Sequence, residues 1–287
     1  MINKVHERLH STKAWKESKN NIENNIKNGY YGTWNTYTEL VERWSEDKRP
    51  VICCMAGKSL DFALPKISKL DRGKYRLITI DQTQYRLVEE KLKPDLMFSM
   101  DFMNFGELGF FTGMKDTAMV VPCSANTDNV KRWKGMKYIY RSVALGNDEL
   151  SRAYNQKTLL AGDIGIQYNL SNIGLSVLQF CETIKAKSYW VGLDFGFIDN
   201  KTFFDGLYEK FGGVFPVARE IQVNEMENFY TNKQYAVFAL SFLNYLTAHK
   251  YEIGYCSRGG LLDIEIKNDK GERIDQYVRR CELEEIV

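Results

Sequence analysis

The stretch VICCMAGKSLD, residues 51–61, decides the fold. Its first seven residues are an apolar run that ends in Gly57, a pattern typical of a strand buried on both faces. The amphipathic segment 58–70 predicts a helix, and Ser59 stands where a helix cap is expected. A buried strand that passes through a glycine turn into a helix is the first half of a βαβ unit.

The same alternation continues along the chain. Residues 75–81 and 96–101 predict two more buried strands with a helix between them. Further strands are expected at 118–122, 137–141, 188–194 and 252–257, helices at 172–186 and 225–249, and loops at 142–163. We therefore predict an α/β fold, a Rossmann-like three-layer sandwich with a mainly parallel sheet.

The polar residues 1–48 have apolar positions at helical spacing, so they predict an N-terminal helical extension. Residues 49–287 contain no evident linker and no internal repeat. We predict that they form one Rossmann-like domain, on which the extension packs.

Composition excludes several classes of protein. A formal net charge of +2 on 287 residues is not the electrostatic footprint of a nucleic-acid binder. No run reaches the roughly 18 apolar residues of a membrane span, and the charged N-terminus lacks the apolar region of a signal peptide. We expect a cytoplasmic protein whose six cysteines are small core residues, and with three histidines a histidine-based metal site is not expected.

Candidate site residues follow from one rule: in doubly wound sheets, ligands bind beyond the carboxyl ends of the strands. The residues at the predicted strand ends are Gly57, Lys58, Ser59, Asp61, Asp81, Asp101, Asp194, Ser257, Gly259 and Gly260. Asn172 and Gly174 open a predicted helix, where amide groups would face a base or a phosphate. For Asn172 and Gly174 the alternative is simple capping, and for Gly259 and Gly260 it is a turn.

The turn at Gly57 predicts a phosphate site. Glycine allows a ligand to approach the backbone, and the helix start beyond it presents unpaired N–H groups. Lys58 and Ser59 would add donors, and Asp61 would support the loop or a ribose. The alternative is a tight strand-to-helix turn, because the loop lacks the first glycine of a P-loop.

Three predicted strands end in aspartate, at Asp81, Asp101 and Asp194. Asp101 and Asp194 are the candidate catalytic residues, as Mg²⁺ ligands or as a general base toward an acceptor hydroxyl. Any one of them could instead cap the next turn. The convergence of all three favours a functional site.

An ordered set of short motifs strengthens this interpretation. The motifs are G-x-S-L-D at 57–61, K-P-D and its strand at 93–101, N-I-G at 172–174, V-G-L-D at 191–194 and S-x-G-G at 257–260. In this order they resemble the MptE-like family, also called DUF115, over roughly residues 50–262. That family includes archaeal 6-hydroxymethylpterin diphosphokinases and the motility accessory factors that glycosylate flagellin. Its usual loop is G-x-G-P-S-L-D; here Met55 or Ala56 replaces the first glycine, and Lys58 replaces the proline.

The resemblance implies a nucleotide or nucleotide-sugar donor over the Gly57 loop, with Mg²⁺ as a further cofactor. Glycosyl transfer from a CMP-nonulosonate type of donor is favoured, because the polar helical extension is similar to accessory segments of the glycosylating branch. ATP-dependent diphosphate transfer to a hydroxymethylpterin is the alternative. A catalytically inactive module that binds a nucleotide or a partner is the third hypothesis, supported by the altered loop. The acceptor, whether sugar, protein hydroxyl or pterin, stays open.

Overall fold

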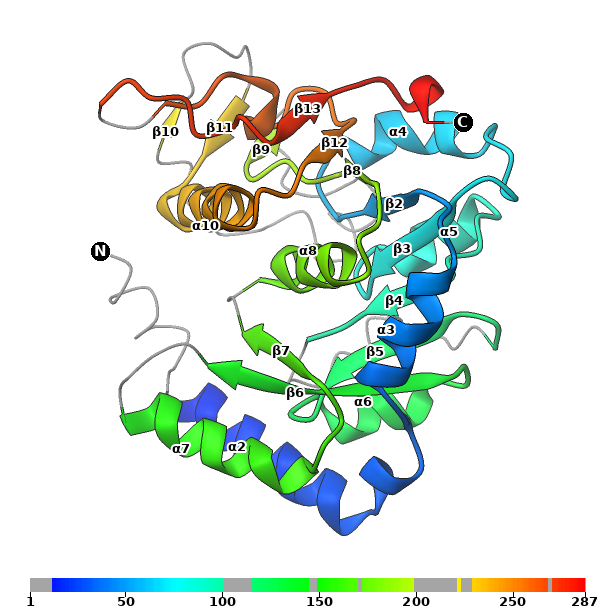
Figure 1. Ribbon diagram of the computed structural model, residues 1–287, viewed down its shortest axis with the longest axis vertical. Coiled ribbons are helices and arrows are strands. Elements are labelled where there is room, and N and C mark those ends of the chain that lie inside the picture. Colours follow the sequence, from blue (N-terminus) through cyan, green and yellow to red (C-terminus); the bar gives the residue numbers. More distant parts are fainter. Residues whose placement is uncertain are drawn as a thin grey trace. The chain divides into compact units, whose positions relative to one another are not determined.

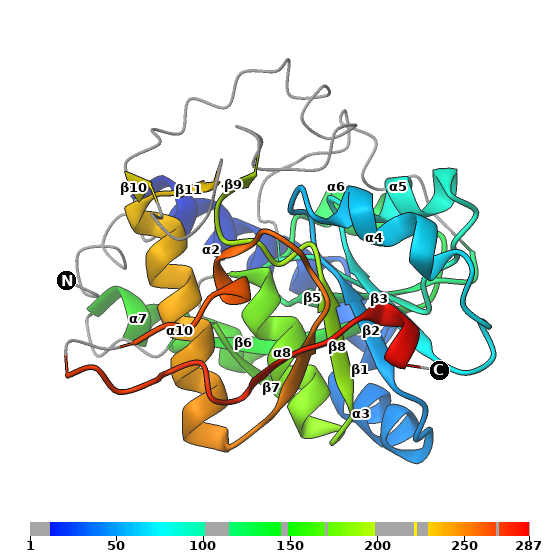
Figure 2. The same cartoon turned by 90° about the horizontal axis from the view of Figure 1, so that it is seen from above.

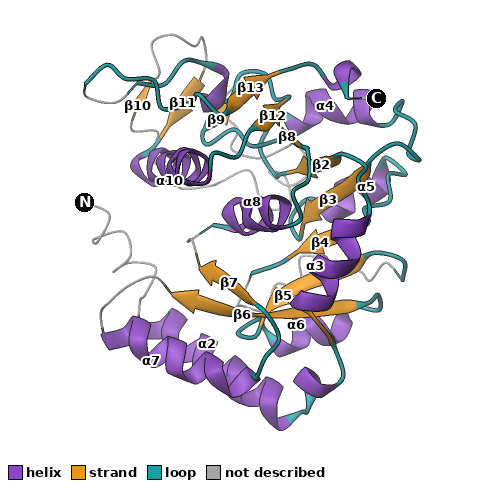
Figure 3. Ribbon diagram, viewed as in Figure 1, coloured by secondary structure: helices purple, strands orange, loops and turns teal. Residues whose placement is uncertain are grey.

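The computed structural model describes residues 12–100, 115–144, 149–169, 172–198, 221–222, 229–267 and 270–286. Figure 3 shows their helices and strands. The chain forms two compact units, each built from two separate stretches. The first unit comprises Met1–Lys48 and Pro94–Lys185, and the second comprises Arg49–Lys93 and Ala186–Val287. The N-terminal helices thus belong to a unit with residues from the middle of the chain.

The first unit contains a parallel sheet with helices around it. Its strands in spatial order are β1 (Asn35–Thr36), β6 (Lys137–Ala144), β5 (Ala118–Pro122) and β4 (Leu96–Phe98), and β7 (Ile166–Asn169) also pairs with β6. Its helices are α2 (Thr12–Lys27), α3 (Tyr37–Glu46), α6 (Thr127–Arg132), α7 (Glu149–Thr158) and α8 (Ile173–Thr183), with 3₁₀ turns η1 (Tyr30–Gly32) and η3 (Leu159–Ala161). In Figure 1, α2 and α7 lie side by side.

A buried asparagine attaches α2 to this unit. The side-chain amide of Asn25 is fully buried and donates to the carbonyls of Cys123 and Ala125, both at 3.1 Å. The Tyr31 hydroxyl donates to the same Cys123 carbonyl at 2.8 Å. These bonds give the carbonyls of Cys123 and Ala125, just beyond the end of β5, side-chain donors.

The second unit contains five parallel strands. Their spatial order is β3 (Arg76–Ile80), β2 (Val51–Cys54), β8 (Ser188–Val191), β12 (Ile253–Tyr255) and β13 (Val278–Arg280). Its other elements are α4 (Leu60–Ile67), α5 (Gln84–Glu89), α10 (Lys233–His249), η4 (Leu261–Asp263), η5 (Leu283–Glu285) and a small antiparallel sheet of β9 (Phe197–Ile198), β11 (Phe229–Thr231) and β10 (Ile221–Gln222).

The direction in which the chain crosses from strand to strand over the sheet reverses between the neighbouring parallel strands β2 and β8. From β2 it crosses through α4 to β3 on one side, and from β8 it crosses through α10 to β12 on the other. Right-handed crossovers in opposite directions place the two helices on opposite faces of the sheet. Figure 2 shows α4 and α10 on either side of β2 and β8. This reversal is the topological switch point, beyond which ligands bind in open α/β sheets.

The core explains why the strand pattern is readable in the sequence. Every residue of β2, β3 and β8 is buried, as expected for strands covered on both faces. The fully buried Trp190 packs edge-on against Phe242 of α10, with ring centroids 5.3 Å apart. This contact fixes α10 on its face of the sheet.

The predicted α/β fold with mainly parallel strands and N-terminal helices is confirmed, and all seven predicted strands occur. The expectation of loops at 142–163 is wrong, because α7 and η3 lie there. The predicted domain boundary at residue 48 stays a prediction. Cys53, Cys54, Cys123 and Cys181 are buried, whereas Cys256 and Cys281 are half-buried. No helix within the described residues is long and apolar enough to cross a membrane.

Candidate functional site at the strand ends of the second unit

The turn after β2 packs directly on the turn after β8. The amide of Gly57 donates to the carbonyl of Gly192 at 2.8 Å. A Cβ atom on Gly57 would lie 2.5 Å from both that carbonyl oxygen and Oδ2 of Asp194. Gly192 has a φ of 70°, in the left-handed region that favours glycine. Two glycines therefore allow the two backbones to meet at the switch point.

Asp194 is hydrogen-bonded to the start of α4. Its Oδ2 accepts the backbone N–H of Ser59 at 2.8 Å, and its Oδ1 accepts the Ser59 hydroxyl. Both residues are buried, with 2% and 1% of their surface exposed. A helix N-terminus attracts an anion, and here the chain supplies that anion itself. The Ser59 N–H that we predicted for phosphate is thus bound to Asp194.

Burial gives Asp194 an unusual proton affinity. Loss of hydration raises the pKa of its carboxyl from 3.8 to about 6, although the hydrogen bonds from Ser59 act in the opposite direction. The Asp194 carboxyl thus titrates close to neutrality, in the range that suits general acid–base catalysis.

Lys58 also interacts within its own loop. Its side chain is mostly buried, and its ammonium lies 2.8 Å from the carboxylate of Asp61. The same ammonium lies 5.7 Å from the ring centroid of Phe62, which is a cation–π distance. These contacts hold the first turn of α4 in place.

The turn after β12 joins the same cluster. The Ser257 hydroxyl accepts the amide of Gly192 at 2.8 Å, and Leu261 donates its amide to the Asp194 carbonyl at 2.8 Å. A Cβ on Gly260 would collide with the Tyr255 hydroxyl and would lie 2.9 Å from the Cα of Asp194. Three strand ends, of β2, β8 and β12, thus form one closely packed cluster.

The other predicted residues lie elsewhere. Asp81 is buried after β3 and its Oδ1 accepts the Gln82 amide at 2.8 Å. Gly259 donates its amide to Asp263 at 3.0 Å. Asn172 caps α8 by accepting the Leu175 amide at 3.0 Å, and Gly174 is buried in that helix; both belong to the first unit. Asp101 lies outside the described residues.

The described residues contain no cluster of metal-ligating side chains. No group of three histidine, cysteine, aspartate or glutamate side chains within them is arranged to hold an ion. Asp194 stands against the Ser59 N–H and hydroxyl, which are donors and not fellow ligands. We therefore assign no step to a metal ion, and Mg²⁺ binding by Asp101 and Asp194 stays a prediction.

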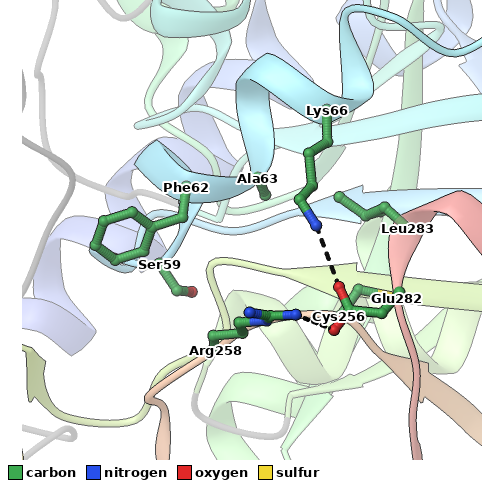
Figure 4. Close-up of a pocket in the computed structure, with 8 residues that line it drawn as sticks. All are labelled: Ser59, Phe62, Ala63, Lys66, Cys256, Arg258, Glu282 and Leu283. Atoms are coloured by element: carbon green, nitrogen blue, oxygen red, sulfur yellow. Dashed lines mark hydrogen bonds and ion pairs between the residues drawn. The ribbon is translucent and has the colours of Figure 1, made fainter.

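A pocket of about 280 Å³ adjoins the cluster, close to the lower size limit of small-molecule sites. Its lining residues are Ser59, Phe62, Ala63, Lys66, Cys256, Arg258, Glu282 and Leu283, drawn in Figure 4. Of these residues only Ser59 was predicted from the sequence, and the charged residues Lys66, Arg258 and Glu282 were not. Arg258 lies inside the S-R-G-G motif, which was a usable signal, whereas Glu282 lies in the charged C-terminal segment with no motif.

Fold and site together define a Rossmann-like α/β protein with a crevice at a topological switch point. The model of the family described as "6-hydroxymethylpterin diphosphokinase MptE-like" matches residues 20–200. The chain belongs to this family. No curated protein matches the chain.

The fold is similar to that of the MAf glycosyltransferase from Magnetospirillum magneticum AMB-1. The TM-score is 0.57 and the sequence identity is 12%. The likeness covers 82% of this chain and 33% of that one, so this chain spans about a third of the length of that protein. At this identity the likeness shows the fold. The family description and the name of the Magnetospirillum protein both denote group-transferring enzymes.

Proposed function

We propose that this chain is a nucleotide-dependent transferase, and more specifically a glycosyltransferase that uses a nucleotide-activated sugar of the CMP-nonulosonate type. The observation that carries the proposal is the cluster at the β2–β8 switch point, where Gly57, Gly192 and Asp194 meet. Nucleotides in open α/β sheets bind beyond this point. Family membership and the fold shared with a glycosyltransferase support the same class of reaction.

Within this proposal the cluster forms the floor of the donor site. Gly57 and Gly260 carry no side chain, so the turns after β2 and β12 can pack closely against Asp194 at the floor. Asp194 holds the start of α4 through Ser59 and supplies a carboxyl that titrates near pH 6. A carboxylate of this kind suits a general base that removes the proton of an acceptor hydroxyl. Asp194 would then need to exchange its bond to the Ser59 hydroxyl for one to the acceptor.

The diphosphokinase hypothesis is a second candidate, favoured by the description of the family to which the chain belongs. Both reactions need a bound nucleotide, but they differ in its identity. A glycosyltransferase of the proposed type binds CMP and CMP-sugars. A diphosphokinase binds ATP in the presence of Mg²⁺.

A thermal-shift screen distinguishes these alternatives. The purified protein is heated with CMP, a CMP-sugar, UDP-sugars, ATP, and ATP with Mg²⁺. A ligand that binds only the folded state at a hundredfold excess over its Kd stabilises it by about 2.7 kcal/mol. We expect CMP and the CMP-sugar to raise the Tm. We also expect the protein to hydrolyse the CMP-sugar slowly to free CMP, which a separate assay for CMP detects. A rise with ATP and Mg²⁺ alone supports the diphosphokinase, and no rise with any nucleotide refutes both.

A further inference from the structure

Three hydrogen-bond donors converge on the carboxylate of Glu282. The Lys66 ammonium lies 3.1 Å from Oε2, and the Arg258 guanidinium donates to Oε1. The backbone N–H of Glu285, at the end of η5, donates to the same side chain in a capping box. Figure 4 shows Lys66 and Arg258 approaching Glu282 from different sides. Two cations and an amide around one carboxylate form a typical anion site, occupied here by the chain's own side chain.

The position of this anion site links it to the crevice. Lys66 lies on α4, Arg258 follows β12 and Glu282 follows β13, so all three elements belong to the second unit. All three side chains line the pocket that Ser59 also lines. The side chain of Glu282 is 45% exposed and that of Arg258 is 73% exposed. Exposed ion pairs are weak and exchange readily, so an incoming anion can compete with Glu282 for both cations.

The start of α4 is a poor alternative for a phosphate. Its Ser59 N–H and hydroxyl are both bound to the buried Asp194. A phosphate placed there would lie against a carboxylate that is ionised at neutral pH, and like charges at short range repel. Lys66 and Arg258 offer two cations instead.

An apolar surface suited to a base completes the pocket. The ring of Phe62 lines it and has 52% of its surface exposed, although large apolar side chains are usually buried. Exposed aromatic rings bind nucleobases by stacking, with little dependence on which base is present. The pocket therefore combines a stacking surface with an anion site, as a nucleoside phosphate requires.

We propose that this pocket is the nucleotide subsite, in which Lys66 and Arg258 bind a phosphate that displaces the internal carboxylate of Glu282 while Phe62 stacks on the base. The inference rests on the proposed nucleotide dependence and adds the residues that hold the donor. It also assigns the C-terminal segment an inhibitory role, since Glu282 competes with the ligand.

Calorimetric titration of the full-length protein with inorganic pyrophosphate and with CMP, at low salt, tests the two cations. Lys66→Ala and Arg258→Ala are each expected to weaken the binding of both probes about tenfold, the effect of losing one charge-assisted hydrogen bond. Lys69→Ala is the matched control, because Lys69 is exposed just beyond the end of α4 and does not line the pocket. It is expected to change either affinity less than about twofold.

Glu282→Gln tests whether Glu282 competes with the ligand for Lys66 and Arg258 or only holds the C-terminal segment in place. Because the variant removes the competing charge, it is expected to bind pyrophosphate and CMP several times more tightly than wild type. Glu284→Gln is the control, since Glu284 also lies 3.1 Å from Lys66 but does not line the pocket. Equal affinities of Glu282→Gln and wild type, measured on folded protein, would overturn the inhibitory role.

Phe62→Ala distinguishes the base from the phosphate. It is expected to weaken CMP binding about tenfold and to leave pyrophosphate binding unchanged.

Tight CMP binding that is unaffected by Lys66→Ala and Arg258→Ala would refute this subsite and leave the proposed function intact. Pyrophosphate binding that depends on both cations, without any nucleotide binding, would support the anion site and refute the nucleotide. Binding of neither probe to wild type and Glu282→Gln would overturn the inference.

Discussion

Replacing Asp194 with asparagine tests the buried carboxylate at the switch point. The asparagine side chain has nearly the same shape and would still accept the Ser59 N–H, but it cannot ionise. The pKa of Asp194 rises from 3.8 to about 6 because the folded protein removes the carboxyl from water. At 1.36 kcal/mol for each tenfold change in proton affinity, this rise corresponds to about 3 kcal/mol.

The sign of the effect follows from proton binding. Between about pH 4 and pH 6 the folded state holds the Asp194 proton, while the unfolded chain has released it. The stability that this group contributes is therefore complete below pH 3.8 and is lost as the pH rises through about 6. The free energy of unfolding of wild type, minus that of Asp194→Asn, should fall by about 3 kcal/mol from about pH 3 to about pH 7.

Urea unfolding of both proteins at several pH values measures this difference. All other titrating groups are shared, so their contributions cancel. Glu42→Gln is the control, since it removes an exposed carboxylate of α3 and should give a curve parallel to wild type. A constant difference between wild type and Asp194→Asn over this pH range would refute the assignment of a buried, ionising Asp194.

Three further predictions concern separate parts of the chain. Gly57→Ala should lower the free energy of unfolding by about 2 kcal/mol because its methyl group would overlap neighbouring atoms. Gly32→Ala is the control: no atom lies within 4 Å of its Cβ, so the free energy of unfolding should change by less than about 1 kcal/mol. Calorimetry measures both. Asn25→Ala should cost about 2 kcal/mol by removing two buried amide donations, and should speed hydrogen exchange in α2; unchanged exchange would contradict this anchor. The sulfurs of Cys256 and Cys281 lie 3.0 Å apart, so diamide should oxidise the two thiols to a disulfide by accepting their two electrons and two protons. Peptide mass spectrometry detects the disulfide, and absence of the linked peptide would contradict the geometry.

The thiol pair has a physical asymmetry that favours this oxidation. A hydrogen bond joins the two sulfurs, and this interaction raises the pKa of Cys256 and lowers that of Cys281. The thiolate is the reactive form of cysteine, so Cys281 is the expected first site of oxidation. Cys281→Ser is therefore expected to abolish the linkage.

The sequence allowed the strands of the sheet to be predicted because buried parallel strands are continuous apolar runs. Residues 51–54 and 188–191 are buried at every position, so both are recognisable without any partner. The rule that ligands bind beyond strand ends then selected Gly57, Asp194 and Ser257, and the structure brings these three residues together. This rule could not predict the hydrogen bonds between Asp194 and Ser59, because the apolar pattern of the strands does not determine their spatial order.

The pocket residues were missed for a different reason. Lys66 and Glu282 are 216 residues apart, and neither lies in a motif. An exposed lysine on a helix and a glutamate in a charged tail are ordinary surface residues until the fold brings them together. The edge strand β13 was missed as well, since Val278–Arg280 contains a single buried residue.

The arrangement of strands around β2 determines when the crevice can exist during synthesis. β2 pairs with β8, and the hydrogen bond from Ser59 to Asp194 spans 135 residues. The anion site further requires residues 258 and 282, close to the end of the chain. Residue 282 must therefore have left the ribosome before the anion site can form, and contacts of such long sequence separation form slowly. Until β8 has been synthesised, β2 can pair only with β3, so the edge of β2 that later pairs with β8 keeps its backbone groups unpaired.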